Sequence, residues 1–151
     1  MKLSIDLDDT ILVRHDFPFI EINTSPLERG AIIEYFRAGT RKLFEYLESK
    51  NFEIGIYTNS YRGKSDLEKW FRENDFPITF IINQQIHDSR IDQEKNRYSL
   101  PDKCPHLFDI DIHIDDLPEI KEECEKYGSK VILAPSDEDW VEKVIEEINK
   151  L

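Results

Sequence analysis

Long apolar runs and cysteine pairs are missing from this sequence. The 151-residue chain has no run near the roughly 18 apolar residues that a transmembrane helix needs, and no apolar segment with a cleavage site follows Met1. Cys104 and Cys124 form no C-x-x-C pair and have no histidines at the spacing of a zinc site. We therefore predict two free, structural thiols and a cytoplasmic protein with no membrane partner.

Positive charge is also scarce. The chain has 20 Lys and Arg residues against 32 Asp and Glu residues, which gives a net charge of −12. A basic face that attracts nucleic acid non-specifically is therefore not expected. The negative charge does not exclude an anionic substrate, because a bound divalent cation can reverse the local field.

Repeats, low-complexity stretches and linkers are absent as well, so we expect a single domain over residues 1–151. Strand-like and helix-like segments alternate, and several strand-like segments are continuous apolar runs, which is typical of strands covered on both faces. This alternation predicts an α/β fold, a three-layer α/β/α sandwich with a Rossmann-like parallel sheet. The expected strands are Lys2–Leu7, Glu53–Thr58, Ile78–Asn83, Ile110–Ile114 and Lys130–Leu133, and the expected helices are Thr40–Lys50, Lys64–Asn74, Pro118–Tyr127 and Asp137–Lys150, the last with Ser136 as its N-cap.

Two stretches do not fit this alternation. Residues 14–36 contain two prolines and are predicted to form a loop or short hairpin that serves as a flap. Residues 84–105 are polar, also contain two prolines, and are predicted to form a long loop. Loops of this length in a compact domain are often functional.

Acidic residues gather directly after the first expected strand. The segment Asp6-Leu7-Asp8-Asp9-Thr10 follows the apolar Leu3-Ser4-Ile5. Ligands of open α/β sheets bind at the carboxyl edge of the strands, where this segment would lie. Crowded carboxylates repel each other, so the cluster indicates a bound cation, an acid–base pair or a solvated turn. A calcium EF-hand loop is excluded, because the positions that require Gly and Glu hold Ile11 and Phe17.

Further polar groups are expected at the same edge. Thr58-Asn59-Ser60 follows the second strand, Lys103 precedes the fourth strand, and Asp115-Asp116 follows it directly. This order resembles the haloacid dehalogenase (HAD) superfamily of phosphatases and phosphotransferases, whose pattern is D-x-D-x-T, then Ser or Thr, then Lys or Arg, then paired acids. The resemblance spans nearly the whole chain. The matching residues are Asp6, Asp8 and Thr10, then Thr58, then Lys103, then Asp115 and Asp116.

The resemblance implies a phosphatase that works through an aspartyl-phosphate. Asp6 would attack phosphorus, and Asp8 would protonate the leaving oxygen and later take a proton from water. Thr58 and Asn59 would bind the phosphoryl group, while Lys103 would neutralise charge and orient Asp6. An aspartate at position 8 implies phosphate-ester chemistry rather than cleavage of a carbon–halogen bond.

The resemblance also implies Mg²⁺ as the cofactor. The side chains of Asp6, Asp115 and Asp116 would hold it, together with the backbone carbonyl of Asp8. Asp116 is the favoured direct ligand, and Asp115 would bind either directly or through water. Both acids could also cap the helix expected from Pro118, and the two roles are compatible.

Several positions keep a second interpretation. Lys95 and Arg97 lie on the same polar stretch as Lys103 and are its rivals for the role of catalytic cation. His113 lies inside an apolar strand, which favours a hydrogen-bonded core histidine over a ligand. Arg62, shortly after the second motif, is predicted to be a solvated surface residue, with steering of an anionic substrate as the alternative.

The segments between the motifs are too short for the large cap domain that many HAD enzymes carry, so we expect an open site. The expected partner is a phosphorylated substrate, either a small molecule or an exposed phosphate on a larger molecule, and an oligomer is compatible with this organisation. Two other functions remain open at this point. One is a non-catalytic HAD-like domain that binds phosphate or metal, and the other is a phosphotransferase of the same fold.

Overall fold

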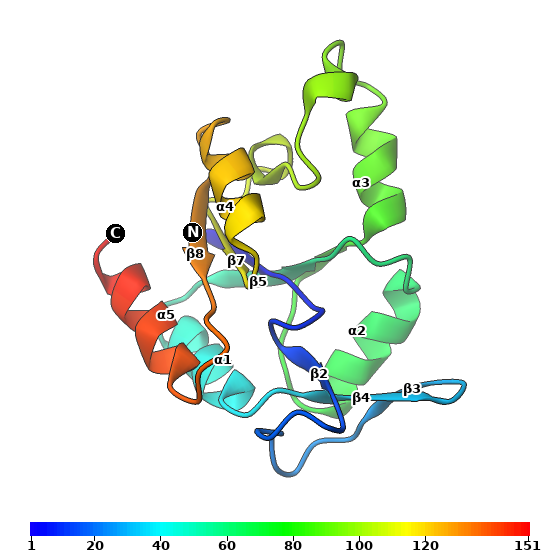
Figure 1. Ribbon diagram of the computed structural model, residues 1–151, viewed down its shortest axis with the longest axis vertical. Helices are drawn as coiled ribbons and strands as arrows, with labels where there is room; N and C mark the ends of the chain where they lie inside the picture. Colours follow the sequence, from blue (N-terminus) through cyan, green and yellow to red (C-terminus); the bar gives the residue numbers. More distant parts are fainter.

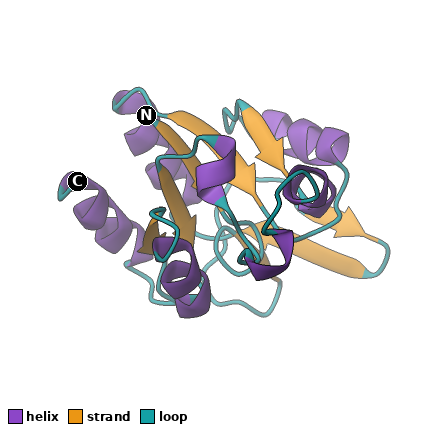
Figure 2. Ribbon diagram, turned by 90° about the horizontal axis from the view of Figure 1, so that it is seen from above, coloured by secondary structure: helices purple, strands orange, loops and turns teal.

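Five parallel strands form the central sheet of the computed structural model, which describes residues 1–151 (Figure 1). Helices flank this sheet, so the α/β fold is confirmed and its layering is Rossmann-like (Figure 2). From one edge to the other, the strands are β6 (Phe80–Ile82), β5 (Glu53–Tyr57), β1 (Lys2–Ile5), β7 (Ile112–Asp115) and β8 (Lys130–Leu133). The chain runs from β1 through β5 to β6 and then returns to β7 and β8. The direction of winding therefore reverses between β1 and β7, where ligands bind in folds of this type.

The main core lies on one face of the sheet. Successive side chains of a strand point to opposite faces, and Leu3 and Ile5 of β1 point to this one. They join a cluster of 24 buried apolar residues. The helices that complete this cluster are α1 (Thr40–Ser49), α2 (Lys64–Glu73) and α5 (Trp140–Asn149). In Figure 1, α1 and α5 lie side by side on the left.

The opposite face has two smaller cores and the polar groups of the site. Val131 of β8 packs with Ile120 and Cys124 of α4, which spans Pro118–Glu125. Tyr57 of β5 packs in a second small cluster that contacts α3, which spans Gln84–Ile91. By the same alternation that buries Leu3 and Ile5, Ser4 and Asp6 point toward this less apolar face.

Helix α3 corrects the expectation of one long loop over residues 84–105. Asn83 caps this helix, because its side-chain oxygen accepts a hydrogen bond from the backbone N–H of Ile86 at 3.0 Å. The rest of that stretch contains one short 3₁₀ turn, Arg97–Ser99, and a second, Pro105–Phe108, begins at its last residue. The polar stretch is therefore only partly irregular.

Helix α5 begins later than predicted, at Trp140 rather than Asp137, and Ser136 is not its N-cap. The preceding turn is held by the buried Arg37, whose Nη2 donates to the carbonyl oxygens of Pro135 at 2.5 Å and Asp137 at 3.1 Å. These bonds hold the turn in a non-helical path, which delays the start of the helix.

The predicted flap contains a second, antiparallel sheet. Its strand order is β2 (Leu12–Arg14), β4 (Ile32–Phe36) and β3 (Leu27–Arg29). β3 and β4 form a hairpin that extends to one side of the molecule (Figure 1). Its tight turn contains Gly30 at φ 57°, a conformation that glycine adopts without strain. The hairpin expected from the sequence is present, and a third strand extends it.

None of the helices is both long enough and apolar enough to cross a lipid bilayer.

Candidate functional site

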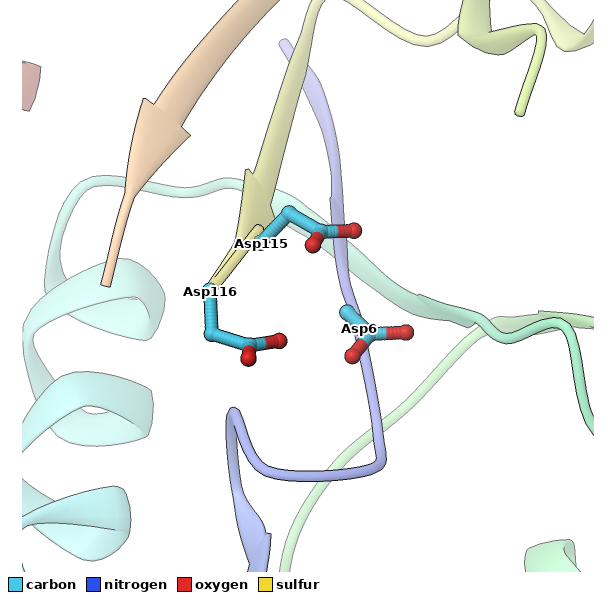
Figure 3. Close-up of side chains that lie close together, drawn as sticks. All are labelled: Asp6, Asp115 and Asp116. Carbon is cyan, nitrogen blue, oxygen red and sulfur yellow. The ribbon is translucent and has the colours of Figure 1, made fainter. Parts of the chain in front are cut away.

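Three carboxylates meet at the carboxyl ends of β1 and β7, where the winding reverses. Asp6 directly follows β1, Asp115 is the last residue of β7, and Asp116 comes next. Each offers one oxygen, and these oxygens all lie within 4.8 Å of one another. Figure 3 shows the three side chains converging from the two neighbouring strands. Because two strands distant in sequence supply them, the cluster depends on the fold.

A tight turn after β1 brings Thr10 back over Asp6. The backbone N–H groups of Ile11 and Leu12 both donate to the carbonyl oxygen of Leu7, at 3.2 and 2.8 Å. Asp9 adopts a φ of 63°, the left-handed region that Asp tolerates better than most residues. The turn places the Thr10 hydroxyl 3.1 Å from Asp6 Oδ2 and 3.0 Å from Asp116 Oδ1.

Lys103 lies between two of the acids. Its ammonium group donates to Asp6 Oδ1 at 2.5 Å and to Asp115 Oδ2 at 2.6 Å, and its side chain is only 3% exposed. Lys95 and Arg97, its rivals in the sequence, are both exposed. Lys103 is thus the lysine that the fold brings to the acidic cluster.

The backbone around Lys103 is fixed from two sides. The hydroxyl of Tyr57 accepts a hydrogen bond from the N–H of Cys104 at 2.8 Å. The thiol of Cys124, on α4, donates to the carbonyl oxygen of Lys103 at 3.2 Å. Both cysteines are buried and unpaired, as the sequence predicts. Residues of β5 and α4 therefore fix the backbone segment that carries Lys103 beside the acids.

His113 forms a hydrogen bond with Asp115 and helps to orient its carboxylate. This histidine is fully buried, as its position in an apolar strand predicts, and its Nε2 lies 3.0 Å from Asp115 Oδ2. A carboxylate only accepts hydrogen bonds, so Nε2 carries the proton and Nδ1 accepts from the Ser4 hydroxyl at 2.8 Å. The backbone N–H of Leu117 donates to the other Asp115 oxygen at 2.9 Å. Asp115 is thus oriented through both of its oxygens.

The acids of the cluster have different proton affinities. Burial and the charge of Asp115 outweigh the effect of Lys103 and raise the pKa of Asp6 to about 7. Burial also raises the pKa of Asp116. Burial would raise the pKa of Asp115 too, but the hydrogen bond from His113 and the charge of Lys103 lower it to about 2. Burial lowers the pKa of His113 to about 4, so this histidine is neutral at pH 7.

The cluster suits a divalent cation. Three carboxylates face a single ammonium group, which leaves an excess of two negative charges when all three are ionised. The Thr10 hydroxyl has one proton, yet it contacts oxygens of both Asp6 and Asp116, so one of these oxygens lacks a donor. Carboxylate oxygens are the ligands that Mg²⁺ prefers in proteins.

Asp8 lies outside the group of three acids and pairs with an arginine instead. Its two carboxylate oxygens accept hydrogen bonds from the guanidinium of Arg62, at 2.9 and 3.0 Å. No hydrogen bond within the chain takes the backbone carbonyl oxygen of Asp8. Arg62 also pairs with Glu34 of β4. The expectation of a solvated Arg62 is wrong, because two carboxylates hold this side chain in a buried position where only 6% of it is exposed.

Thr58 and Asn59 flank the cluster without bonding to its acids. Thr58 directly follows β5 and is fully buried, and its hydroxyl accepts a hydrogen bond from the N–H of Ser60 at 3.1 Å. Asn59 is exposed. The backbone N–H of Thr58 donates to Ile82 of β6 at 2.9 Å. The Thr58 hydroxyl is thus used as an acceptor, and its own proton is the donor that this strand end still offers.

The sequence analysis missed two features beside the acidic cluster. It did not identify Glu34, and it did not predict that Arg62 is buried. Arg62 lies in a polar stretch, so hydropathy does not distinguish it from a surface residue. Glu34 is the one charged residue in the apolar segment Ile32–Phe36, and this is a signal of a paired acid that could have been used. Their pairing joins segments 28 positions apart and depends on how β4 packs beside α2. A pattern search confined to strand ends could not have found it.

Comparisons with known proteins give no further guide. No protein-family model matches the sequence, and a search of curated proteins found no significant match.

Proposed function

We propose that this chain is a Mg²⁺-dependent phosphomonoester hydrolase of the HAD-like type, without a large cap domain, that acts through an aspartyl-phosphate on Asp6. The observation that carries the proposal is the buried Asp6 carboxylate, which is bonded to Lys103 and lies beside the Asp115–Asp116 pair where the winding of the sheet reverses. The same residues carry the sequence resemblance to that superfamily.

The first step is transfer of the phosphoryl group to Asp6. A carboxylate oxygen of Asp6 attacks phosphorus as the bond to the leaving oxygen breaks, and this reaction needs positioning and charge neutralisation more than covalent assistance. Lys103 is bonded to one Asp6 oxygen, so it fixes the carboxylate plane and offsets charge on the transferring group. Thr58, at the neighbouring strand end, would donate its hydroxyl proton to a phosphoryl oxygen, and Asn59 would bind the phosphoryl group beside it.

Asp8 handles the proton in both half-reactions. It lies two positions after Asp6, on the turn that brings Thr10 back over the site. Asp8 takes up a proton from solvent before the reaction and gives it to the leaving oxygen in the first half-reaction. In the second it takes a proton from the water that attacks the aspartyl-phosphate, which restores the protonated acid. The products are the free alcohol, inorganic phosphate and regenerated Asp6.

Asp6, Asp115 and Asp116 would hold the Mg²⁺ ion, with the carbonyl oxygen of Asp8 as a further oxygen ligand. When bound, the ion supplies positive charge against the phosphoryl oxygens. His113 and Leu117 keep Asp115 oriented for this role, and Thr10 orients Asp6 and Asp116. The β2–β4–β3 sheet serves as the flap beside the site.

The test is hydrolysis of p-nitrophenyl phosphate with Mg²⁺, with EDTA, and by the Asp6→Asn variant. We expect activity with Mg²⁺ that EDTA abolishes, and a loss of at least about a thousandfold in Asp6→Asn because the nucleophile is removed. Asp9→Asn is the matched control: it makes the same chemical change in the same turn, at an exposed residue whose left-handed conformation Asn adopts readily.

Two outcomes would count against the proposal. Full turnover by Asp6→Asn would show that Asp6 is not the nucleophile. Binding of Mg²⁺ without turnover across nucleotides, sugar phosphates and phosphopeptides would instead support a non-catalytic domain that binds metal.

A further inference from the structure

We propose that Arg62 is a positioning residue for Asp8, and that Glu34 holds Arg62 in place from the flap sheet. This inference rests on the proposed function, because it assigns a role in the proton transfers of the same site. It adds two residues from outside the four sequence motifs, and it makes the flap a part of the catalytic machinery.

Asp8 depends on Arg62 for its orientation. The side chain of Asp8 is 49% exposed, and both hydrogen bonds that it receives come from Arg62. The guanidinium binds the two carboxylate oxygens through two separate nitrogens, a fork that fixes the plane of the carboxylate as well as its position. Without this fork, a half-exposed aspartate on a turn would sample several rotamers, and proton transfer needs one.

Arg62 is itself fixed at both ends. At its tip, Nη2 donates to the two oxygens of Glu34 at 2.8 and 3.0 Å, and both side chains are buried. At its backbone, the N–H donates to Ser60 Oγ and the carbonyl oxygen accepts from Asn83 Nδ2, each at 3.1 Å. A long side chain held in this way loses little freedom when it orients Asp8.

Glu34 has no other function that the structure suggests. It lies on β4, outside the group of acids that converge on Asp6, and its one other cationic neighbour is the half-exposed Arg29 at 3.9 Å. A buried glutamate is unfavourable unless it is paired. Burial would lower the pKa of Arg62, but the hydrogen bond and charge of Asp8, with the charge of Glu34, raise it. The hydrogen bonds of Nη1 and Nη2 thus join the guanidinium to both acids at once.

A positioning role predicts a selective effect on catalysis. Protonation of the leaving oxygen matters most for alkyl phosphates, whose leaving groups are strongly basic, and least for p-nitrophenyl phosphate. If Arg62 acts through Asp8, its loss should slow alkyl esters more than aryl esters. A change that only loosened the fold would slow all esters alike.

The experiment measures kcat/KM for a series of phosphate monoesters whose leaving groups range from alcohols to p-nitrophenol. Arg62→Lys keeps the charge beside Glu34 but cannot form the fork. We expect kcat/KM to fall about tenfold or more for alkyl esters and no more than about twofold for p-nitrophenyl phosphate. Glu34→Gln should give the same pattern with a smaller loss. Lys64→Ala is the control, because Lys64 is an exposed cation two positions away that pairs only with Glu68.

The outcomes separate this inference from the proposed function. An equal loss for every ester in both Arg62→Lys and Glu34→Gln, or a raised KM alone, overturns the positioning role while Asp6-dependent hydrolysis stands. In an Asp8→Asn background, Arg62→Lys should have no further leaving-group selectivity, and a persistent selectivity would also overturn it. If wild-type protein hydrolyses no ester, the proposed function fails and this inference fails with it. Melting curves of each variant establish that it is folded.

Discussion

Asp6 is subject to two opposing requirements. As the proposed nucleophile it must be ionised, yet it is buried beside Asp115, and this environment raises its pKa to about 7. Lys103 offsets only part of that cost in the metal-free protein. A residue whose charged form is unfavourable in the fold is typical of functional sites, where activity is maintained at the expense of stability.

This conflict predicts that Asp6→Asn stabilises the metal-free protein, and does so more strongly at higher pH. The pKa of Asp6 is raised from 3.8 to about 7, so the folded state holds a proton that the unfolded state has released. The stability of the wild type that is linked to this group is therefore lost as the pH rises from about 4 to about 7. Urea denaturation in EDTA at pH 5 and pH 8 should show a larger advantage for Asp6→Asn at pH 8.

The comparison between the two proteins isolates Asp6 from other titrating groups. His113, whose pKa is lowered to about 4, changes stability in the opposite direction over part of this range, but it is present in both proteins. Asp115, whose pKa is lowered to about 2, contributes stability that is lost only below about pH 4. An advantage of Asp6→Asn that stays constant or shrinks with rising pH would contradict this account.

Secondary-structure elements differed in how well the sequence predicted them. The five strands of the main sheet were found because continuous apolar runs mark strands buried on both faces. Helix α3 was missed because it has no apolar stripe and His87 is its one buried residue. Its N-cap, Asn83, was instead taken as the end of a strand. A polar helix that is stabilised by its cap and by tertiary contacts gives little periodic signal.

The attachment of the flap sheet to α2 depends on Trp70. The ring of Trp70 stacks on Phe36 of β4 with centroids 3.8 Å apart, and its Nε1 donates to the carbonyl oxygen of Ser25 at 2.9 Å. Trp70→Ala should lower the free energy of unfolding by about 3–5 kcal/mol, because it leaves a cavity and an unpaired carbonyl. Urea denaturation followed by circular dichroism measures this loss.

Lys69→Ala is the control for Trp70→Ala, since Lys69 is an exposed neighbour on the same helix with a single i,i+4 ion pair. Its effect should stay within about 0.5 kcal/mol. A loss of less than about 1 kcal/mol in Trp70→Ala would show that the flap is held mainly by other contacts.

At the scale of the whole molecule, the strand-end pattern placed acids at one edge of the sheet, and the family resemblance selected Asp6, Asp115 and Asp116 among them as the acids that would share a cation. That Asp6, Asp115 and Asp116 converge follows from β1 and β7 being neighbours. Asp8 pairs with Arg62 instead, and no strand-end pattern contains that pairing. Spacing along the chain identifies which residues reach the carboxyl edge of the sheet. Tertiary packing decides which of these side chains pair with each other.

Mg²⁺ should stabilise the whole fold if the three acids bind it. A ligand at about 100 times its Kd adds about 2.7 kcal/mol to the free energy of unfolding, which raises Tm by several degrees in a domain of this size. We expect this rise in the wild type and not in Asp116→Asn. Asp92→Asn removes one negative charge at an exposed position and is the control for general effects of charge. A rise of equal size in all three proteins would indicate ionic screening rather than a site.

The site unites Thr10 with Asp116, which lie 106 positions apart. During synthesis, the N-terminal two-thirds of the chain can emerge from the ribosome with β1, β5 and β6 paired while the other edge of β1 is still open. A nascent chain at that stage carries Asp6, the proposed nucleophile, without the acid pair of the proposed metal site. The proposed activity would therefore arise late in translation, when β7 docks beside β1.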